Sequence, residues 1–400
     1  MASSSSLTVT GVDTSAVNDP AARQALVDRL RAVLDGAETI APLPAPGSAP
    51  APTPVRLDER DLAAGRPAVV LPTSGSTGEP KQVMLSAAAL RASAAATHAR
   101  LGGAGGWLLA LPPWHVAGLQ VLLRAAGSGQ PVAVTEPGPF TAQSFVTGAG
   151  RLHSGRRYVS LVPTQLRRLV DDASAVAALR DFDMVLLGGA AADPALLASA
   201  ADAGVRIMLT YGMSETCGGC VYNGVALDGV SVELLDGQRI RLTGPVVANG
   251  YAGRPDDPAF ARPGSFLTND LGVLEGDILT VLGRADDVIV TGGMKVAPAR
   301  LEHALGAVPG IGEVLAVGIP DDEWGEAVTA LHTGAQLPES AVRQALSALP
   351  GYYRPRRWLA VPRLPVRGPG KPDRRAAAEL ARRAARALPP EAEPSHPDTS

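Results

Sequence analysis

The side chains best suited to chemistry gather in residues 71–81, which read LPTSGSTGEPK. The segment holds four hydroxyls, two glycines and a terminal lysine: Thr73, Ser74, Ser76, Thr77, Gly75, Gly78 and Lys81. Hydroxyls donate hydrogen bonds to phosphate oxygens, glycines let the backbone approach a polyanion, and lysine adds a mobile positive charge. The pattern indicates a loop that holds a triphosphate, although the same residue types also form ordinary surface turns. It is not a Walker loop, because the lysine follows a proline and precedes a glutamine.

Other polar groups follow apolar, strand-like runs further along the chain. His115 ends LPPWH, where it could contact a substrate or simply be a polar residue at a helix start. Gly189 and Ala190 end VLLGGA, where two glycines allow either close approach to a flat ring or a tight turn. Glu215, in YGMSET, is a hard oxygen ligand suited to Mg²⁺ shared with phosphates, or else a solvated acid.

The C-terminal part of the chain has three further segments of interest. GRADD, residues 283–287, could be an exposed charged turn. TGGMKVAP, residues 291–298, contains a Gly-Gly pair that also suits a plain hairpin turn. LPVRGPGK ends at Lys371, whose ammonium could stabilise negative charge that develops on a phosphate, or could be a solvated charge in a loop.

Length and composition limit the class of protein. A chain of 400 residues is too long for one compact core and suggests two domains. Its 36 basic and 39 acidic residues give a net charge of −3, so no global field attracts nucleic acid. No apolar run is long enough to span a membrane, and the N-terminus lacks the pattern of a secretory signal. Cys217 and Cys220 are expected to be reduced, buried or half-buried thiols in a cytoplasmic protein.

The elements that must position these groups follow from hydrophobic periodicity. Apolar runs predict strands at 68–71, 107–111, 132–134, 158–162, 184–187 and 206–210. Amphipathic helices are predicted at 20–35, 86–100, 115–126, 164–171 and 194–203. The alternation favours an α/β layer with parallel strands, whose carboxyl ends carry the loops at 72–81, 112–115, 188–190 and 211–216.

Beyond this layer the pattern changes twice. Residues 228–282 alternate like a small antiparallel β unit that closes the large domain. A smaller α+β pattern follows, with helices around 301–308 and 342–349 and strands at 314–319, 327–331 and 357–361. We therefore predict an extension with a helix and a Pro/Ala linker at 1–66, a large domain at 67–283, a small domain at 284–383 and a disordered tail at 384–400.

The motifs, taken together and in this order, resemble those of the adenylate-forming superfamily, which includes acyl-CoA synthetases, luciferases and adenylation domains. The likeness runs from Thr73 to Lys371, about three quarters of the chain. It implies a large domain that binds ATP and the acyl substrate, and a small domain that swivels on a hinge. It also implies ATP, Mg²⁺ and coenzyme A as the molecules bound.

The resemblance assigns expected roles residue by residue. The loop from Thr73 to Lys81 and Ser214 would contact phosphates, with Ser214 in place of the usual threonine. The remaining ATP-binding residues would lie around adenine and ribose: Gly189, Ala190, Tyr211, Gly212 and Asp270. Arg284 would lie close to ribose and phosphate. In the motif that contains Asp270, Asn269 replaces the usual glycine.

The other implied roles concern the metal, the two reaction steps and the hinge. Glu215 would hold Mg²⁺, Lys371 would be catalytic, and His115 would lie at the acyl pocket. Asp286 would be the hinge residue, and Gly292 and Gly293 would border the coenzyme A side.

Residues 109–120 and 211–220 resemble most closely the short o-succinylbenzoate–CoA ligases of menaquinone biosynthesis. This resemblance predicts an acid–CoA ligase that works through an acyl-AMP intermediate on a small-molecule acid. Three alternatives stay open: another aryl, fatty or amino acid as substrate, a phosphotransferase that releases ADP, and a nucleotide-binding module without catalysis. The residues that recognise the acid and a homo-oligomeric state also stay open.

Overall fold

The computed structural model describes residues 6–44, 55–73, 81–153, 155–235, 238–306, 308, 310–334, 338–367 and 371–387. The chain divides into two compact units, Met1–Val281 and Leu282–Ser400. The division falls after residue 281, close to the boundary predicted after residue 283. Each unit has its own sheets and its own hydrophobic cores and is described separately.

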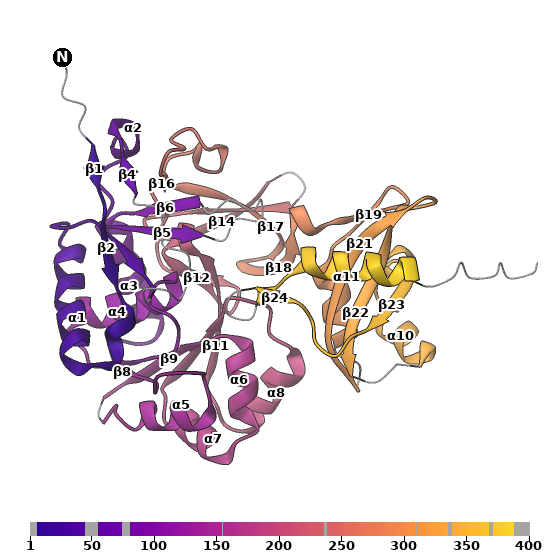
Figure 1. The fold of residues 1–400 in the computed structure, drawn as a ribbon, viewed down its shortest axis with the longest axis horizontal. Coiled ribbons are helices and arrows are strands. Elements are labelled where there is room, and N and C mark those ends of the chain that lie inside the picture. Colours follow the sequence, from indigo (N-terminus) through magenta and orange to yellow (C-terminus); the bar gives the residue numbers. More distant parts are fainter. Residues whose placement is uncertain are drawn as a thin grey trace, which may run out of the picture. The chain divides into compact units, whose positions relative to one another are not determined.

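The first unit is built on an eleven-stranded sheet, one half of which is parallel (Figure 1). The parallel half has the order β11-β10-β9-β7-β8. Its strands are β7 (Gly106–Leu109), β8 (Val132–Val134), β9 (Arg157–Leu161), β10 (Met184–Gly188) and β11 (Ile207–Met213). Five of the six predicted strands are therefore confirmed as neighbours in one parallel layer, although β11 extends through residues 211–213, which were predicted as loop.

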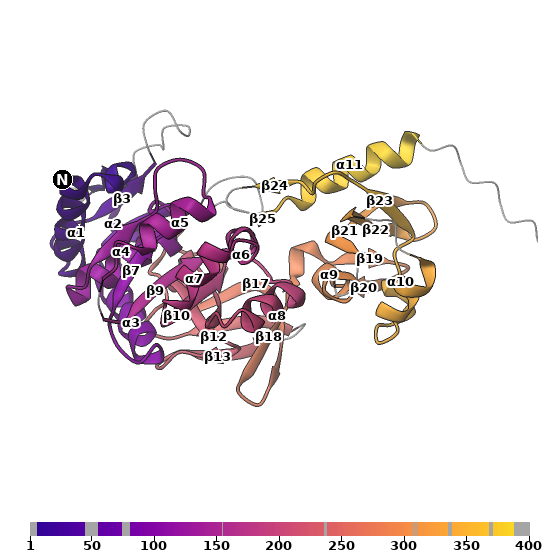
Figure 2. The same ribbon diagram turned by 90° about the horizontal axis from the view of Figure 1, so that it is seen from below.

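Helices cover both faces of the parallel half (Figures 1 and 2). One side carries α1 (Pro20–Leu34), α3 (Ala87–Arg100) and α4 (Val116–Ser128); the other carries α5 (Ala142–Ala149), α6 (Pro163–Val170), α7 (Ala173–Arg180) and α8 (Pro194–Asp202). Because side chains alternate along a strand, Trp107 and Leu109 enter the first core while Leu108 enters the second. The predicted α/β class is confirmed.

The antiparallel strands after residue 217 extend the same sheet. They are β12 (Gly218–Tyr222), β13 (Val225–Ala226), β14 (Ser231–Leu235), β15 (Arg239–Thr243), β17 (Ser265–Glu275) and β18 (Ile278–Arg284). The link is β12, which pairs antiparallel with β11. The predicted antiparallel strands are therefore present, and they continue the parallel layer, because the chain reverses directly at the end of β11 and adds strands to that edge.

A second, five-stranded sheet in this unit has the order β16-β6-β5-β3-β2. Its strands are β2 (Thr10–Asp13), β3 (Ile40–Leu43), β5 (Val69–Thr73), β6 (Lys81–Leu85) and β16 (Gly250–Tyr251). The predicted strand at 68–71 is thus real but lies in this sheet, paired antiparallel with β6, and not in the parallel layer. The segment predicted as an N-terminal extension supplies β2, β3 and α1 to the first unit, besides β1 (Leu7–Thr8), β4 (Arg56–Leu57) and α2 (Glu59–Leu62).

The second unit places one sheet between two layers of helices. The strands are β19 (Ile289–Thr291), β20 (Met294–Val296), β21 (Ile311–Asp321), β22 (Gly325–Gly334) and β23 (Arg357–Ala360). Helices α9 (Pro298–Gly306) and α10 (Glu339–Ala345) pack in one core, and α11 (Arg374–Ala387) packs in the other. Helix α11 was not predicted, and residues 384–387 belong to it and not to a disordered tail.

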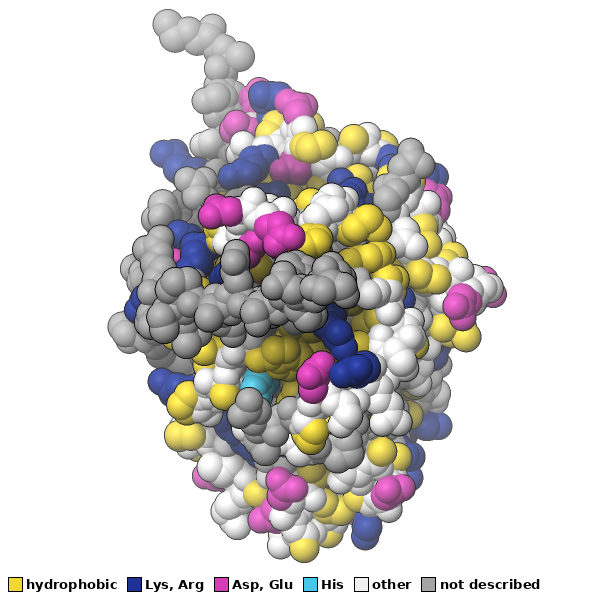
Figure 3. All heavy atoms as spheres, turned by 90° about the vertical axis from the view of Figure 1, so that its right-hand side faces the viewer, with side chains coloured by type: hydrophobic (Ala, Val, Ile, Leu, Met, Phe, Trp, Pro, Cys, Tyr) yellow, Lys and Arg dark blue, Asp and Glu magenta, His cyan; other side chains and the backbone are white. Residues whose placement is uncertain are grey.

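Two further features concern the charge on one face of the molecule and the hydropathy of its helices. The face drawn in Figure 3 carries acidic, basic and apolar side chains interspersed with one another. Over the described parts of the chain, no helix combines the length and the apolar character that crossing a membrane requires.

Candidate active site

The predicted phosphate loop joins two antiparallel strands of the smaller sheet in the first unit. Strand β5 ends at Thr73 and β6 begins at Lys81, and these two residues are register partners. The Thr73 hydroxyl donates a hydrogen bond to the Lys81 carbonyl oxygen at 3.3 Å. The predicted residues between them, Ser74, Gly75, Ser76, Thr77 and Gly78, lie outside the described residues. The structure therefore fixes the two ends of the loop.

The Lys81 ammonium already has two partners. Its Nζ lies 3.3 Å from Oδ2 of Asp257 and 4.2 Å from the centre of the Tyr251 ring. The Lys81 side chain is only 23% exposed, so both interactions are partly shielded from water. A cation held over an aromatic face is attracted to it and loses mobility. The Lys81 ammonium is thus held in place at the end of the loop.

Glu215, the predicted metal ligand, is a buried carboxylate in a short 3₁₀ helix, Ser214–Thr216, directly after β11. The Tyr251 hydroxyl donates to its Oε1 at 2.7 Å, and the Ala248 amide donates to its backbone carbonyl at 2.9 Å. Burial, and then the Glu215 carboxylate, raise the pKa of Tyr251 well above its usual value, so the phenol stays neutral.

The side chains around Glu215 suit a cation whose other ligands come mostly from substrate phosphates and water. Within the described residues, no three His, Cys, Asp or Glu side chains gather as a metal-binding group. Mg²⁺ is commonly bound through one or two carboxylates together with substrate phosphates and waters. A single buried carboxylate fits that kind of site, whereas it would not fit a cation that needs several protein ligands.

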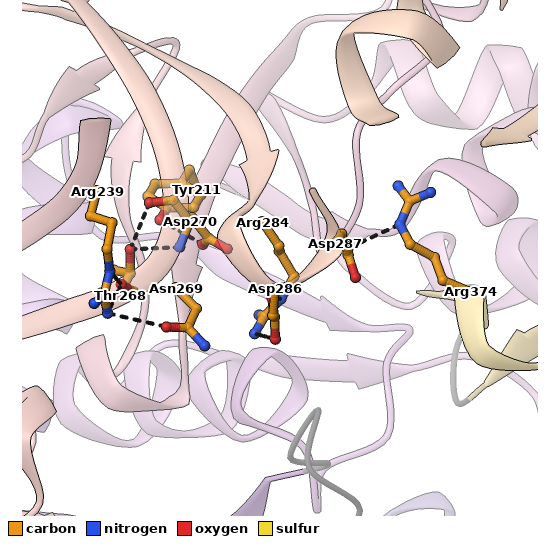
Figure 4. Close-up of polar contacts among 9 residues, drawn as sticks. All are labelled: Tyr211, Arg239, Thr268, Asn269, Asp270, Arg284, Asp286, Asp287 and Arg374. Carbon is orange, nitrogen blue, oxygen red and sulfur yellow. Dashed lines mark hydrogen bonds and ion pairs between the residues drawn. The ribbon is translucent and has the colours of Figure 1, made fainter. Parts of the chain in front are cut away.

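Tyr211 and Asp270, predicted to contact the nucleoside, are bonded to each other (Figure 4). The Tyr211 hydroxyl donates to Oδ2 of Asp270 at 2.7 Å. Burial, and then the Asp270 carboxylate, raise the pKa of Tyr211 far above its usual value. The Asp270 amide donates in turn to Oγ1 of Thr268 at 2.9 Å. The Tyr211 hydroxyl is therefore a neutral donor, and the Asp270 carboxylate is its acceptor.

The register between β11 and β12 shifts directly after this tyrosine, between Tyr211 and Gly212, as at a β-bulge. A Cβ atom at Gly212 would lie 2.1 Å from the Gly218 carbonyl oxygen, so the close approach of β11 and β12 requires glycine there. The half-buried Ser214 follows two residues later at the start of the 3₁₀ helix. The motif is thus positioned by the sharp reversal between β11 and β12.

Arg239 is a contact residue that the sequence did not indicate. Its Nε and Nη2 donate to the Thr268 carbonyl oxygen at 3.1 and 2.8 Å, and Nη2 also donates to Oδ1 of Asn269 at 3.1 Å (Figure 4). A hollow of about 490 Å³ is lined by Leu234, Leu235, Arg239 and Leu267. Asn269, which departs from the family's glycine, therefore has a specific partner on the neighbouring strand β15.

The segment 188–190 makes a tight turn after β10. Gly189 has φ +84°, a left-handed conformation that favours glycine. A Cβ at Gly188 would lie 2.3 Å from the Thr210 hydroxyl on β11. These contacts explain both glycines by backbone geometry, and the half-buried Ala190 follows them. The role of Gly189 and Ala190 beside adenine stays a prediction.

His115 stands at the N-terminal boundary of α4, with an exposed side chain. Its ring centre lies 6.2 Å from that of Trp114, and its imidazole makes no capping hydrogen bond to the helix. An exposed imidazole at a helix start is accessible to a small molecule. Contact with an acyl substrate stays a prediction.

In the second unit, the predicted hinge residue Asp286 accepts two hydrogen bonds from one arginine. Arg284 donates from Nε and Nη2 to the two oxygens of Asp286 at 2.8 and 2.9 Å (Figure 4). Asp286 lies in a 3₁₀ turn, Ala285–Asp287. Arg374 on α11 anchors the end of this turn by donating to Oδ2 of Asp287 at 2.9 Å. Arg374 also binds Glu302 of α9, which ties both helices to the turn.

Gly292 and Gly293 form the two-residue turn between β19 and β20, with φ +55° and +76°. Positive φ at both central residues is typical of a type I′ hairpin turn. The Gly292 amide donates to the Trp324 carbonyl oxygen at 2.9 Å, and a Cβ at Gly292 would lie 2.8 Å from the Trp324 ring. The two glycines therefore form the plain hairpin turn. Their position beside coenzyme A stays a prediction.

Lys371 begins the short strand β25 (Lys371–Pro372), which pairs with β24 (Val366–Arg367). Its backbone is opposite Arg367 in register. The Lys371 side chain lies outside the described part of the chain. Its catalytic role stays a prediction.

Comparison with known families decides the class. A model of the family described as AMP-binding enzyme matches residues 2–253, and a model of the AMP-binding enzyme C-terminal domain matches residues 300–371. The chain belongs to the AMP-binding enzyme family. The first match includes the N-terminal residues that supply β2, β3 and α1, which agrees with their place in the first unit.

Relatives of this AMP-binding enzyme bear consistent names. A protein of Mycobacterium tuberculosis (strain CDC 1551 / Oshkosh), described as a probable 2-succinylbenzoate–CoA ligase, is 48% identical over 77% of this chain and 83% of its own length. A 2-succinylbenzoate–CoA ligase of Listeria monocytogenes serotype 4b is 30% identical over 80% of this chain and 70% of its own. The structure of an O-succinylbenzoate coenzyme A synthetase from Bacillus subtilis in complex with AMP gives a TM-score of 0.68 at 26% identity, covering 80% of this chain and 69% of that one.

Cys217 and Cys220 of this AMP-binding enzyme are free, fully buried thiols, as predicted. Burial raises the pKa of Cys217 and raises that of Cys220 to about 12, so both stay protonated. The Cys217 carbonyl oxygen accepts hydrogen bonds from Ser93 and Gln120 at 3.1 and 2.7 Å. The backbone at Cys217 is therefore bonded to side chains from α3 and α4 just before β12 begins.

Proposed function

We propose that this chain is an ATP-dependent acid–CoA ligase that converts 2-succinylbenzoate into its coenzyme A thioester through an acyl-AMP intermediate, as in menaquinone biosynthesis. The 48% identity to a probable 2-succinylbenzoate–CoA ligase over 83% of that protein's length carries the substrate assignment. The bonded residues Tyr211, Asp270, Lys81 and Glu215 support the nucleotide chemistry.

The first unit supplies most of the nucleotide contacts. The Asp270 carboxylate accepts hydrogen bonds from the ribose hydroxyls, while the Tyr211 ring, held by its bond to Asp270, stacks on adenine beside Gly189 and Ala190. The loop from Thr73 to Lys81 and the Ser214 hydroxyl contact the phosphates. Arg284, bound to Asp286 in this structure, reaches the nucleotide by sharing or leaving that carboxylate.

Glu215 would hold Mg²⁺ together with the phosphates. When bound, the cation offsets phosphate charge and favours departure of pyrophosphate. The buried position of Glu215 fixes this carboxylate before any ligand arrives.

In the first step a substrate carboxylate oxygen attacks the α-phosphorus of ATP. The new P–O bond forms as the bond to the pyrophosphate oxygen breaks, and acyl-AMP results. Negative charge rises on the phosphate oxygens, and the Lys371 ammonium stabilises it. His115 lies at the acyl end of the pocket and contacts the acid.

In the second step the thiol of coenzyme A attacks the acyl carbon. The C–S bond forms, the C–O bond to AMP breaks, and the thiol proton leaves to solvent. The second unit swivels about Asp286, which withdraws Lys371 and brings the Gly292–Gly293 turn beside the thiol arm. Splitting the reaction replaces a poor leaving group, hydroxide, by AMP.

Mass spectrometry of products tests this function. The purified chain, given ATP, Mg²⁺, coenzyme A and 2-succinylbenzoate, should form AMP, pyrophosphate and 2-succinylbenzoyl-CoA. ADP would indicate a phosphotransferase, and nucleotide binding without turnover a non-catalytic module. If AMP forms only with other acids, an ATP–pyrophosphate exchange screen across aryl, fatty and amino acids identifies the substrate.

We also propose a cytoplasmic location, since two unpaired thiols suit a reducing compartment.

A further inference from the structure

Tyr251 contacts two groups of opposite charge at once. Its ring lies under the Lys81 ammonium at 4.2 Å, and its hydroxyl donates to Glu215 at 2.7 Å. The tyrosine is only 3% exposed, and Glu215 is 8% exposed. Both contacts are therefore at least partly shielded from water, and electrostatic interactions are stronger in such surroundings than in bulk water.

Several elements hold this ring in place. Strand β16 pairs with β6, which puts Tyr251 opposite Val83, two residues after Lys81. Phe260 packs edge-on against the ring at 5.1 Å and 81°. The Ala248 amide, three residues before the tyrosine, binds the Glu215 backbone. The relative positions of Lys81, Tyr251 and Glu215 thus follow from sheet pairing and from packing around one aromatic ring.

Asp257 holds Lys81 independently of the tyrosine. Its Oδ2 lies 3.3 Å from Nζ, while its Oδ1 accepts from the Ala259 amide at the start of a short 3₁₀ helix, Pro258–Phe260. Asp257 and Tyr251 are consequently two separate supports for the same ammonium. Only Tyr251 also reaches Glu215.

We propose that Tyr251 is a positioning residue that sets the Lys81 ammonium and the Glu215 carboxylate for the triphosphate and its divalent cation. The inference rests on the proposed function, because it takes magnesium–ATP as the ligand. A neutral residue that contacts both groups orders them without a direct ion pair between Lys81 and Glu215. An aromatic face attracts a cation and a hydroxyl binds a carboxylate, so one side chain performs both tasks.

Three variants separate these tasks. Tyr251→Phe removes only the bond to Glu215 and keeps the ring under Lys81. Tyr251→Leu removes both. Asp257→Asn weakens the other support of Lys81 and leaves the Glu215 bond in place.

The first readout is binding of a non-hydrolysable ATP analogue to the full chain, by calorimetry across a range of Mg²⁺ concentrations. For Tyr251→Phe we expect the half-saturating Mg²⁺ concentration to rise roughly tenfold, as for loss of one hydrogen bond to a charged group. Asp257→Asn should weaken analogue binding at every Mg²⁺ concentration without that shift. Unchanged Mg²⁺ dependence in Tyr251→Phe, or an equal shift in Asp257→Asn, would overturn the proposal.

The second readout needs no turnover. The chain contains three lysines, Lys81, Lys295 and Lys371, so ¹³C reductive methylation should give three assignable lysine signals by NMR. Dimethylation keeps the positive charge. The Lys81 signal, assigned with Lys81→Arg, should be shifted upfield by the Tyr251 ring in the unmutated chain and in Tyr251→Phe, and should lose that shift in Tyr251→Leu. A Lys81 signal without ring shift would refute the arrangement.

The two proposals fail in different ways. A chain that forms no AMP with any acid contradicts the ligase function, yet the lysine spectrum and the Mg²⁺-dependent binding still decide the role of Tyr251. Conversely, an active ligase whose Tyr251→Phe variant shows no change in Mg²⁺ dependence keeps the function and loses the positioning role.

Discussion

Two tyrosines, the half-buried Tyr211 and the buried Tyr251, donate hydrogen bonds to two carboxylates in the first unit. Tyr211 binds Asp270, and Tyr251 binds Glu215, both at 2.7 Å. Burial and the neighbouring carboxylate raise the pKa of each phenol, so neither tyrosine ionises near neutral pH. Each carboxylate therefore accepts a hydrogen bond from a neutral phenol, which fixes its orientation. The proposed nucleotide and cation contacts use the oxygens of these ordered carboxylates.

At the residue scale, Lys371→Ala should separate the two half-reactions. Loss of the ammonium removes stabilisation of charge that develops only during attack on the α-phosphorus, so acyl-AMP formation should fall by roughly 10²-fold or more. Thioester formation from supplied acyl-AMP should be largely spared. Single-turnover measurement of each half-reaction checks this, and equal losses in both would show that Lys371 has no step-specific role.

His98 gives the stability of the first unit a predictable pH dependence. Burial, and then the nearby Arg124, lower the pKa of His98 to about 4 from a usual value of 6.5. Because the folded pKa is depressed, the unfolded chain takes up this proton first. The free energy of unfolding should therefore be unaffected by His98 above pH 6.5 and should decrease as the pH falls from 6.5 towards 4.

Urea unfolding of the intact chain and of His98→Gln at pH 7 and pH 5 measures this contribution. The unmutated chain should lose more stability than the variant over that interval, by at most about 1 kcal/mol per pH unit for a half-exposed imidazole. Equal losses in the two proteins would mean that His98 titrates normally in the folded chain.

At the scale of elements, the hydrophobic periodicity of the sequence predicts the helices and strands that local sequence alone determines. The parallel strands and the helices α1, α3, α4, α6 and α8 follow from apolar spacing, and they occur close to the predicted residues. Helix α11 escaped prediction because its apolar stripe is made of small residues, Ala377, Ala378 and Ala381, between many arginines. Sheet membership escaped prediction as well: β5 has the same apolar run as a strand of the parallel layer, and its partners β6 and β3 decide where it lies.

The candidate site shows the same difference between residues that local sequence indicates and residues that only the fold brings together. The motifs indicated Lys81, Tyr211, Glu215 and Asp270, which the structure shows as partners in hydrogen bonds or ion pairs. Tyr251 on β16 contacts Lys81 and Glu215, and Arg239 on β15 bonds Thr268 and Asn269 beside Asp270. Each of these contacts joins residues more than twenty positions apart along the chain. Such partners depend on strand pairing between distant segments, which spacing within one sequence does not reveal.

The 3₁₀ turn Ala285–Asp287 is the element whose flexibility the proposed swivel requires. Asp286→Pro should restrict φ there, leaving acyl-AMP formation comparatively intact while thioester formation falls by roughly tenfold or more. Asp286→Ala is the control, since it loses the bond to Arg284 without stiffening the backbone. If Asp286→Pro forms the thioester at the unmutated rate, the hinge lies elsewhere.

At the scale of the whole molecule, the division into two units matches the division of the proposed chemistry. Each unit has its own cores: the first packs its sheets against α1 and α3–α8, and the second packs its sheet between α9, α10 and α11. Units that are packed independently can change their relative position without disturbing either core. Most of the proposed nucleotide contacts belong to the first unit, whereas Arg284, Lys371 and the Gly292–Gly293 turn belong to the second.

The most direct test of the account follows the oxygen atoms of the acid. The chain is incubated with 2-succinylbenzoate labelled with ¹⁸O in its carboxylates, together with ATP, Mg²⁺ and coenzyme A, and the AMP is analysed by mass spectrometry. Attack of the carboxylate on the α-phosphorus, followed by cleavage of the acyl C–O bond, should place one ¹⁸O atom in each AMP. Unlabelled AMP, or label in inorganic phosphate with ADP as the nucleotide product, would contradict an acyl-adenylate pathway.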